Sequence, residues 1–432
     1  MTGPKTCSYW LDTAPPFTGG ADGGLDSRTD IAIIGAGFTG LSAALALSQR
    51  GVSVTVLEAD RAIGAASGRN GGHCNNGLAH DYAALSAKLG RDRAGAYYRA
   101  HVAAVDTVER LARENDIDCD FRRPGRLKLA AKPEHFEKLA RAHDVLRAEI
   151  DTDVALVTPD HIGDEIGSAA FHGGLIQTTS AQLHVGKFGV GLAHAAARAG
   201  ARIHEHTPAT DILRRPGGGW RVVTPRGEIV ADQVLIATGG GGTGGPLGPL
   251  RWFRRRIVSV GSFIIATQPL DPALLDRLFP RRRNYVTSKN IGNYFRTTTD
   301  NRLIFGGRAR FAVSNPLSDL KSGRILEVTL GRTFPELAGT RIDYCWGGMV
   351  DLTADRLPRA GQHDGLYYSM GYSGHGVQMA TYMGERMAEV MMGRPQANPW
   401  ADLDWPSIPG HLGKPWFLPL VGAYYRVQDI LH

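Results

Sequence analysis

Hydrophobic residues occur along the chain both in short continuous runs and at helical spacing. Residues 30–35 form an apolar run ending at a glycine, the pattern of a buried parallel strand. From 40 to 50 the apolar spacing becomes helical and rich in Ala and Leu, and Gly51 follows as a C-terminal glycine should. Residues 52–57 predict a second strand, which closes on Glu58. The order strand, glycine-rich turn, helix, strand indicates a βαβ unit.

The rest of the chain predicts further elements in blocks. Helical spacing covers most of 81–150, interrupted by a basic turn near 122–125, and returns at 182–199. Alternating segments across 251–312 suggest an antiparallel sheet, and a last helix is expected over 376–392. Further strands are expected at 202–204, 220–224, 228–230, 233–239 and 365–371. A chain of 432 residues is long for one core, so two domains are expected.

A glycine-rich turn follows the first strand. Gly35, Gly37 and Gly40 form a G-x-G-x-x-G pattern, and Glu58 ends the next strand eighteen positions after Gly40. In such a turn the first glycine allows the tight bend, the second lets the backbone approach a pyrophosphate, and the third lets helix and strand pack. The pyrophosphate then meets a helix N-terminus, which favours negative charge. The pattern predicts a dinucleotide site, with Glu58 accepting hydrogen bonds from ribose hydroxyls.

Three further segments favour FAD over NAD. Residues 66–72 come shortly after Glu58, where a flavoprotein would have a loop that passes the cofactor. Arg69 in this segment either pairs with phosphate, holds the loop in place or makes a structural salt bridge. Residues 236–239 are similar to a strand-end motif of flavoproteins that bind two dinucleotides. Residues 371–376 precede an amphipathic helix, whose dipole would stabilise an anionic reduced flavin. An amino-terminal dinucleotide site closed by a carboxy-terminal segment is typical of FAD enzymes.

Composition narrows the function classes. Four cysteines without C-x-x-C spacing predict neither a disulfide framework nor structural zinc, and they favour a reducing cytoplasm. The histidines of the chain apart from His375, including His204 and His206, lack carboxylate or cysteine partners at the spacing of metal ligands. No metal is therefore expected. The amino terminus lacks the apolar segment of a signal peptide, and no window of eighteen apolar residues predicts a membrane span.

The formal charge is +7, and basic clusters lie within 251–256 and at 281–283. Three interpretations remain open: solvated surface, attraction of an acidic substrate or partner, and nucleic-acid binding. The clusters lack interleaved aromatic residues and match no nucleic-acid module, so nucleic acid is not expected as a partner.

Together these motifs resemble the D-amino-acid-oxidase superfamily of FAD enzymes, which includes glycine and sarcosine oxidases, and within it the branch similar to gamma-glutamylputrescine oxidoreductase. The resemblance covers about residues 8 to 395, and its motifs are 8–10 (Ser-Tyr-Trp), 67–72 (Ser-Gly-Arg-Asn-Gly-Gly), 346–353 (Trp-Gly-Gly-Met-Val-Asp-Leu-Thr) with Asp355 and Pro358, and 371–376 (Gly-Tyr-Ser-Gly-His-Gly).

The resemblance implies an α/β fold with two domains. We expect a discontinuous, Rossmann-like FAD-binding domain formed by 28–80, 181–250 and 345–395. A substrate domain with a mixed or antiparallel sheet and helices would comprise 81–180 and 251–344. Residues 1–27 are expected to form an extended arm, and the tail 396–432, rich in Trp, Pro and Tyr, to pack on the body or to form a partner surface.

The chain departs from better-known relatives at several positions. Amino-acid oxidases of this group often hold the substrate carboxylate with an arginine where this chain has Val350, which favours an amine substrate. Asp351, which follows, either receives an ammonium group or is structural. Ile304 stands where sarcosine oxidases have a lysine that promotes the reaction with O₂, so oxidase and dehydrogenase remain open. Gly348 stands at their flavin-linking cysteine, so FAD is expected to be non-covalent.

The function expected from the resemblance is FAD-dependent oxidation of a C–N bond in a small amine, with hydride transfer to the flavin and with O₂ or another electron acceptor. An oxidase or dehydrogenase of D-amino or imino acids is the alternative. The candidate catalytic or pocket residues are His375, Arg308, Tyr294, Trp346 and Tyr372, with Arg296 as a further pocket candidate. The candidate FAD contacts are Gly35, Gly37, Phe38, Thr39, Gly40, Glu58, Ala59, Ser67, Gly68, Arg69, Asn70, Gly71, Gly72, Ala209, Thr238, Gly239, Gly374, His375, Gly376 and Val377.

Overall fold

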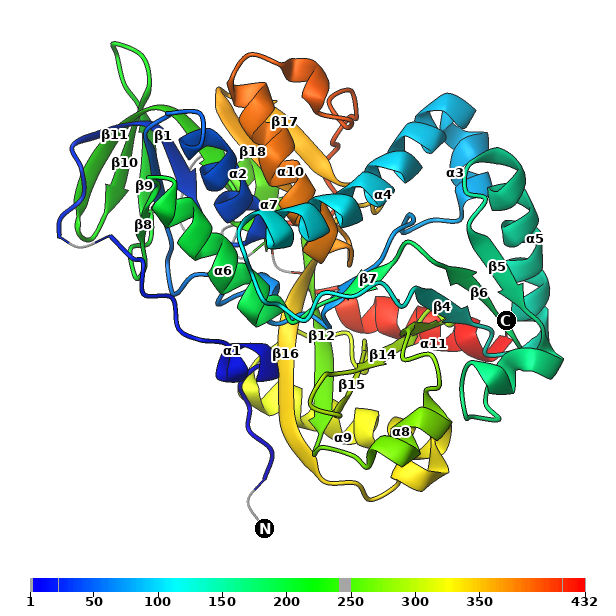
Figure 1. Cartoon of the computed structure of the whole chain (residues 1–432). Coiled ribbons are helices and arrows are strands. Elements are labelled where there is room, and N and C mark those ends of the chain that lie inside the picture. The colour runs from blue at the N-terminus through cyan, green and yellow to red at the C-terminus, as the bar shows by residue number, and fades with distance from the viewer. Residues whose placement is uncertain (1–2, 22, 241–249, 414, 432) are drawn as a thin grey trace.

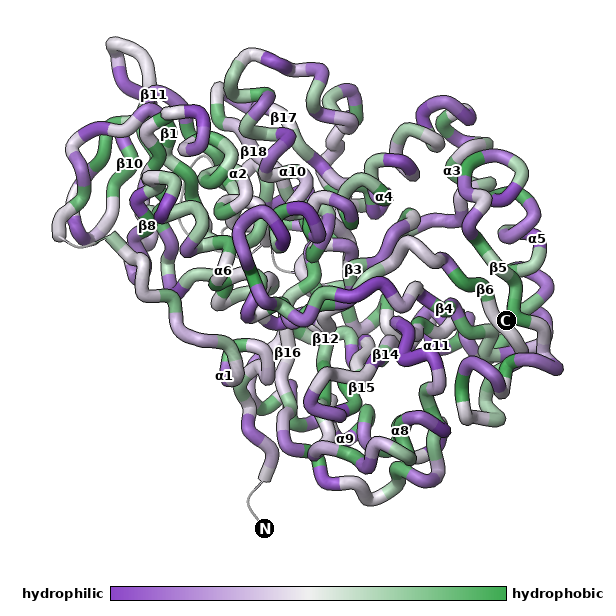
Figure 2. The backbone as a smooth tube through the Cα atoms, in the orientation of Figure 1, coloured by the Kyte–Doolittle hydropathy of each residue, from purple (hydrophilic) through white to green (hydrophobic). Residues whose placement is uncertain are grey.

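The computed structural model describes the whole chain except residues 1–2, 22, 241–249, 414 and 432. The expected FAD-binding segment 181–250 therefore lies partly outside the described residues. Two large mixed sheets organise the molecule, with most helices packed on them (Figure 1). Hydrophobic residues are concentrated in the strands of both sheets (Figure 2).

The first sheet has the strand order β17-β18-β11-β1-β2-β8, and β10 and β9 extend it antiparallel from β11. Five neighbouring strands run parallel, and only β17 at the edge of that path is antiparallel. The strands are β1 (Arg28–Ile34), β2 (Val54–Leu57), β8 (Arg202–His204), β9 (Asp211–Arg214), β10 (Trp220–Thr224), β11 (Gly227–Ile236), β17 (Arg359–His363) and β18 (Leu366–Met370). The expected βαβ unit is present, because α2 (Phe38–Ser48) connects β1 to β2.

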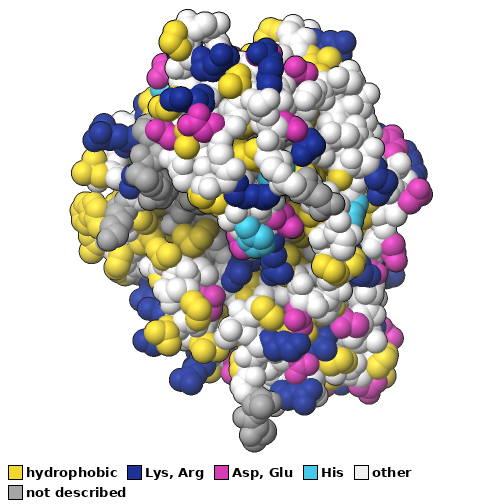
Figure 3. All heavy atoms as spheres, turned by 90° about the vertical axis from the view of Figure 1, so that its left-hand side faces the viewer, with side chains coloured by type: hydrophobic (Ala, Val, Ile, Leu, Met, Phe, Trp, Pro, Cys, Tyr) yellow, Lys and Arg dark blue, Asp and Glu magenta, His cyan; other side chains and the backbone are white. Residues whose placement is uncertain are grey.

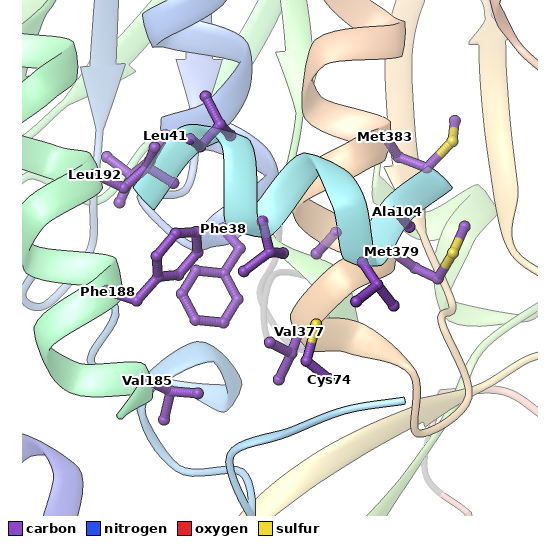
Figure 4. Packing of buried hydrophobic residues seen from close by; sticks show 14 of the residues in the cluster. Phe38, Leu41, Cys74, Ala104, Val185, Phe188, Leu192, Val377, Met379 and Met383 are labelled. Carbon is purple, nitrogen blue, oxygen red and sulfur yellow. The ribbon is translucent and has the colours of Figure 1, made fainter. Parts of the chain in front are cut away.

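Three helices from distant parts of the chain pack on this sheet and on one another. They are α2, α6 (Val185–Arg198) and α10 (Gly376–Met391), and the long helix α4 (Arg91–Glu114) packs against α10. Figure 4 shows the apolar side chains between them, with Phe38 beside Phe188 and Met379 near Ala104. Burial of this contiguous apolar surface joins the amino-terminal and carboxy-terminal parts of the chain into one core.

The second sheet has the order β16-β12-β15-β14-β13-β4-β6-β5, antiparallel throughout except for the parallel pair β13 and β4. Its strands are β4 (Arg126–Leu129), β5 (Val154–Val157), β6 (Gly174–Gln177), β12 (Val258–Thr267), β13 (Asn284–Thr287), β14 (Asn293–Thr297), β15 (Leu303–Gly307) and β16 (Ile342–Leu352). Phe263, Phe295 and Phe305 point to one face, where they form a separate core with α8 (Pro272–Leu278) and α9 (Pro316–Thr333). The opposite face therefore carries the alternate residues of each strand.

The remaining elements lie around these two sheets. A small sheet pairs β3 (His73–Cys74) with β7 (Ala181–Gln182). The remaining helices include α1 (Tyr9–Thr13), α3 (Tyr82–Leu89), α5 (Pro133–Glu149), α7 (Arg251–Arg254) and α11 (Leu418–Leu431). Buried residues of α1, α3 and α5 belong to the same core as α2, α6 and α10. In α11, the Asp429 carboxylate accepts hydrogen bonds from the Asn290 and Ile291 amides, at 2.8 Å each, so the tail contacts the loop between β13 and β14.

The structure corrects several sequence expectations. The segments 228–230 and 233–236 belong to one strand, β11, which pairs with β10 in its first half and with β1 in its second, and the strand ends at Ile236 rather than at residue 239. Strand β16 pairs with β12 along its length, so the boundary expected between 344 and 345 falls inside a strand of the second sheet. The arm 1–27 is not entirely extended, because Tyr9 and Trp10 are buried in the short helix α1.

Candidate active site

Three strand ends meet at one edge of the first sheet. Strands β1, β11 and β18 are parallel neighbours, so the segments that follow them at Gly35, Thr238 and Gly371 leave the sheet on the same side. In open parallel sheets, ligands bind at this carboxyl edge. The sheet topology thus brings together the turn at 35–40, the strand end at 236–239 and the segment 371–376, which are far apart in the sequence.

The turn from β1 to α2 has the backbone that the glycines predict. Gly35 has a positive φ of 107°, and a Cβ there would lie 2.9 Å from the carbonyl oxygen of Ala237. A Cβ on Gly40 would overlap the Gly35 carbonyl oxygen. Gly37 is the N-cap of α2 without a side-chain cap, so N–H groups of the first turn, at Thr39 and Gly40, have no partner within the helix. The turn fits a diphosphate by its close backbone and its helix N-terminus.

Glu58 lies beside this turn. Its carboxylate accepts hydrogen bonds from the Ala36 amide at 2.7 Å and the Asp60 amide at 2.9 Å, so it faces the glycine-rich turn. The Thr207 amide donates to the Glu58 carbonyl oxygen at 2.7 Å, which brings the segment that leads to Ala209 alongside. Ala59, the next candidate, is exposed. A carboxylate at the end of the second strand is placed to bind ribose hydroxyls.

Residues 66–72 form a loop beside the start of α2, which we call the cofactor loop. The Phe38 amide donates to Ser67 Oγ at 3.0 Å, which joins the loop to the first turn of that helix. Within the loop, the Gly72 amide donates to Asn70 Oδ1 at 2.8 Å. Arg69 donates from Nε to the Gly347 carbonyl oxygen at 2.7 Å, so of its three possible roles the structure shows that of holding the loop.

Four side chains from outside the cofactor loop donate to its backbone carbonyls. Ser8 Oγ donates to Gly68 at 2.6 Å, and Trp10 Nε1 donates to Asn70 at 2.6 Å. Buried Arg296 donates to the Gly71 carbonyl at 3.1 Å, and Trp346 Nε1 to Arg69 at 3.0 Å. The Arg296 guanidinium also lies 4.8 Å from the centre of the Trp10 ring. The motif at 8–10 therefore supports the cofactor loop, a role that its sequence does not indicate.

The last cofactor segment is the start of α10. His375 is its N-cap, and the helix has no side-chain cap, so N–H groups of its first turn at Gly376 and Val377 have no partner within the helix. Burial lowers the pKa of His375 to about 4, with a further contribution from the charge of Arg126. The imidazole is therefore neutral near pH 7. Gly374 is exposed beside it, with a positive φ of 97°.

The five candidate catalytic residues divide into two groups. The polar atoms of Trp346 and Tyr372 form hydrogen bonds with the segments of the candidate cofactor site. Trp346 Nε1 donates to the Arg69 carbonyl oxygen, and the Tyr372 hydroxyl lies 2.8 Å from both Thr39 Oγ1 and Ser369 Oγ. Tyr294 faces the cofactor loop, because a Cβ on Gly71 would lie 2.7 Å from its ring. Burial raises the pKa of the Tyr294 phenol to about 12, and its hydroxyl lies 2.9 Å from Ser262 Oγ.

Arg308 follows β15 near Tyr294. Burial lowers the pKa of its guanidinium, and the charge of Arg356 lowers it further. No carboxylate partner of Arg308 is found in the described part of the chain. Two guanidinium groups in electrostatic contact without an acid between them favour binding of a negative group. His375, Arg308 and Tyr294 thus remain candidates for contact with flavin or substrate.

Two departures noted in the sequence have a clear structural setting. Val350 pairs with Val260 on the sheet face that also carries Gly348, whose Cβ position lies 3.2 Å from the Arg69 side chain. Asp351 faces the other way and accepts hydrogen bonds from the Gly240 amide and from Ser259 Oγ at 2.9 Å. Burial raises the pKa of the Asp351 carboxyl. The geometry therefore favours a structural role for Asp351 over binding of an ammonium group.

Comparisons with known proteins identify the family of the chain. The family model described as FAD dependent oxidoreductase matches residues 30–390. The chain belongs to this family. It is 30% identical to gamma-glutamylputrescine oxidoreductase of Escherichia coli, with 93% of each chain covered, and 30% identical to the probable oxidoreductase OrdL of Haemophilus influenzae, covering 98% of this chain and 97% of the relative. Glycine oxidase of Geobacillus kaustophilus has the same fold, with a TM-score of 0.74, 20% identity and 89% and 100% of the two chains covered.

These findings confirm the predicted family and fold class, and FAD dependence is a property of the family. This protein is thus an FAD-dependent oxidoreductase that acts on C–N bonds of amines or amino acids. Sequence reasoning quoted Trp10 only as part of the motif at 8–10, and it did not name His73 or Arg126, whose charge acts on both His73 and His375. Of these, His73 carried a signal, because it directly follows the cofactor loop.

Among the described residues there is no group of His, Cys, Asp or Glu that could hold a metal ion, and no helix long and apolar enough to cross a membrane. The basic clusters are partly used inside the fold, since Arg283 pairs with Glu165 at 2.6 Å and Arg256 stacks on Trp252 at 3.9 Å. On the face shown in Figure 3, Lys and Arg side chains alternate with acidic ones.

Proposed function

We propose that this member of the family oxidises the C–N bond of a small amine, either an amine similar to gamma-glutamylputrescine or another primary or secondary amine. The observation that carries the proposal is Val350. It lies on the sheet face beside the cofactor loop, and it leaves that position without the arginine that would hold a carboxylate next to the reacting carbon. The similarity to gamma-glutamylputrescine oxidoreductase over most of the chain supports the same substrate class.

FAD, when bound, supplies the oxidising group that accepts a hydride from the carbon beside the amine nitrogen. The chain supplies position and environment. Tyr294 and Ile304 lie on the sheet face opposite the α8–α9 core, as the alternation of β14 and β15 requires, and would form the wall against which the amine rests. A buried, apolar surrounding favours the neutral amine, whose lone pair assists loss of the hydride. Water then hydrolyses the imine product to an aldehyde and ammonia or a smaller amine.

Neutral His375 and the free N–H groups of α10 would hold negative charge at the cofactor. The helix dipole places partial positive charge at this N-terminus, which stabilises an anion there. No general base is needed for the hydride step, so no catalytic triad is proposed.

We further propose that FAD is held without a covalent bond. Cys345 is the cysteine nearest in sequence to Gly348, but its thiol donates to the Asp319 carbonyl oxygen at 3.3 Å, on the face of β16 opposite to Gly348. Burial raises the pKa of that thiol to about 12, so it remains protonated. Acid precipitation of the holoprotein should release all flavin into the supernatant, and yellow protein in the pellet would contradict this.

A second candidate function follows from Arg308. Its guanidinium has no acidic partner among the described residues and could hold the carboxylate of an amino or imino acid near Tyr294. In this case the reaction is the same, and the substrate carries its carboxylate next to the reacting carbon.

One experiment separates these functions. The purified holoprotein is mixed anaerobically with a panel of amines, D-amino acids and imino acids, and bleaching of the flavin absorbance band is followed. Bleaching by amines supports the first function, and bleaching only by amino or imino acids supports the second. Air is then admitted. Prompt return of the absorbance indicates an oxidase, and a lasting bleach indicates a dehydrogenase with another acceptor. No bleaching by any compound would refute both.

A further inference from the structure

Strand β4 carries two cations on the face of the second sheet that is opposite the α8–α9 core. Leu127 and Leu129 belong to that core, so the alternation of the strand places Arg126 and Lys128 on the other face. Lys128 lies in one cross-strand row with Val286 and Tyr294. Tyr294 is the candidate pocket residue beside the cofactor loop, and two strand spacings of about 5 Å separate it from Lys128, hence about 10 Å.

The guanidinium of Arg126 is held in place from one side. It donates to Gln177 Oε1, Gln177 Nε2 donates to the Tyr98 hydroxyl at 2.8 Å, and that hydroxyl donates to the Asp151 carboxylate. Gln177 is 3% exposed, so this relay is buried. Asp151 is bonded to the tyrosine rather than to the arginine. The relay therefore orients Arg126 without neutralising it.

Buried nitrogen atoms around Arg126 lack hydrogen-bond partners in the described part of the chain. They are Arg126 Nε, His73 Nε2, His101 Nδ1, His375 Nδ1 and Asn76 Nδ2. Buried polar atoms in native proteins almost always have partners. Arg126 Nε and Asn76 Nδ2 can only donate, whereas a neutral imidazole nitrogen donates or accepts according to its tautomer, so the group fits a ligand that supplies acceptor atoms to Arg126 and Asn76. They come from β4, from β3 and the loop that follows it, from α4 and from the N-cap of α10, which are distant in the sequence.

The surroundings of Arg126 and Lys128 carry positive charge. After burial, the charge of Arg126 contributes to the lowered pKa of His375 and, with Arg296 acting more strongly, of His73. The Lys128 ammonium is exposed, yet nearby protein atoms and the charge of Arg126 lower its pKa. Asp81 is the acid that counteracts this shift, and no ion pair of Arg126 or Lys128 is found among the described residues.

We infer that Arg126 and Lys128 bind a carboxylate at the end of the substrate remote from the reacting amine. This inference rests on the proposed oxidation of an amine and specifies its substrate class: aliphatic amines that carry a carboxylate several bonds away from the nitrogen. The Nε and free Nη donors of Arg126 match two carboxylate oxygens, and Lys128 adds a point charge. The separation of about 10 Å corresponds to a chain as long as about three extended residues.

The test compares matched substrates that differ only in the carboxylate. Linear ω-amino acids are compared with the unsubstituted linear amines of equal length, and gamma-glutamylputrescine with N-butanoylputrescine. For the wild-type holoenzyme, kcat/KM is expected to be at least tenfold higher for the carboxylated member at the best length. Arg126→Gln and Lys128→Gln should each lower kcat/KM for that member about tenfold or more through KM, and leave the uncharged amine unchanged.

Two controls keep the result interpretable. Lys138→Gln removes one exposed cation of α5 and changes the net charge equally, so it should leave the substrate preference unchanged. Flavin content by absorbance reports on cofactor binding. Lys128 is exposed, so Lys128→Gln serves where Arg126→Gln fails to fold.

The outcomes distinguish this inference from the function on which it rests. Turnover of amines without preference for a carboxylate, or an equal loss for both members of a pair in the variants, would overturn the inference and leave the proposed function standing. Loss of flavin from either variant would assign the cations to the cofactor and also overturn it. No turnover of any amine by the wild-type enzyme would overturn the proposed function itself.

Discussion

Replacement of Trp10 by phenylalanine tests whether the amino-terminal arm supports the cofactor loop. Trp10 is 1% exposed, and its Nε1 donates to the Asn70 carbonyl oxygen at 2.6 Å. Phenylalanine keeps an aromatic ring beside Arg296 but has no donor, so the carbonyl in the loop loses its partner. An unsatisfied buried acceptor costs about 1–3 kcal/mol.

The protein offers a matched control at Trp400. This residue is also 1% exposed and ring-stacked, but its Nε1 has no hydrogen-bond partner among the described residues. Trp400→Phe therefore removes the same atoms and leaves a similar void, without breaking a hydrogen bond. The difference between the two variants isolates the bond from Trp10 to the cofactor loop.

The expected result is weaker FAD binding by Trp10→Phe than by Trp400→Phe. Since 1.4 kcal/mol corresponds to a tenfold change, loss of the bond should raise the Kd for FAD by about ten- to a hundredfold. The Kd is measured by quenching of flavin fluorescence on titration of the apoprotein, and the free energy of unfolding by guanidinium denaturation. Equal Kd values for the two variants, within about twofold, would show that the arm does not position the loop.

Two further substitutions test the local structure. Gly40→Ala should abolish FAD binding and reduce soluble yield, because its Cβ would overlap the Gly35 carbonyl oxygen, and a yellow Gly40→Ala protein would contradict this. The control Gly163→Ala adds a Cβ at an exposed glycine with no atom within 4 Å, outside the cofactor segments, and should retain flavin absorbance. His184, the N-cap of α6, accepts from the Lys187 amide at 3.1 Å, and burial followed by the charge of Lys187 lowers its pKa to about 4. The unfolded chain therefore binds the proton first as pH falls, and the free energy of unfolding should drop by about 2 kcal/mol between pH 7 and pH 5 from this group. His184→Asn keeps a cap acceptor without the proton, so guanidinium denaturation at both pH values should show a smaller drop than in the wild type, and an equal drop would refute the assignment.

The dinucleotide turn could be predicted from the sequence because its signal is local. Gly35, Gly40 and Glu58 lie within one βαβ unit, where the strand period and the helix period fix their positions relative to one another. The cofactor loop could be located in the same way. Its supports could not, since Trp10 and Arg296 are 60 and 225 residues from the carbonyls that they contact. Contacts at such separations depend on the packing of the whole chain.

Strand β4 shows a different limit of sequence reasoning. Arg126–Leu129 alternates polar and apolar residues over only four positions and follows a long helical stretch, so periodicity gives a weak signal there. The relay from Arg126 through Gln177 and Tyr98 to Asp151 is likewise invisible in the sequence, because its members are 51, 79 and 53 residues apart. Without the sheet register, nothing in the sequence distinguishes Arg126 and Lys128 from the other basic residues of the chain.

The position of the cations on the second sheet gives a physical meaning to Val350. An arginine at that position would hold a carboxylate beside the cofactor loop, next to the reacting carbon. Here the sheet carries valine at that end and has Arg126 and Lys128 on β4, two strands beyond Tyr294 on β14. If the carboxylate is bound at β4, the same rigid sheet sets the distance between the acidic group and the carbon placed at the flavin. The strand spacing then selects chain length, and a change of substrate length requires a new cation on β13 or β6 rather than a change near the flavin.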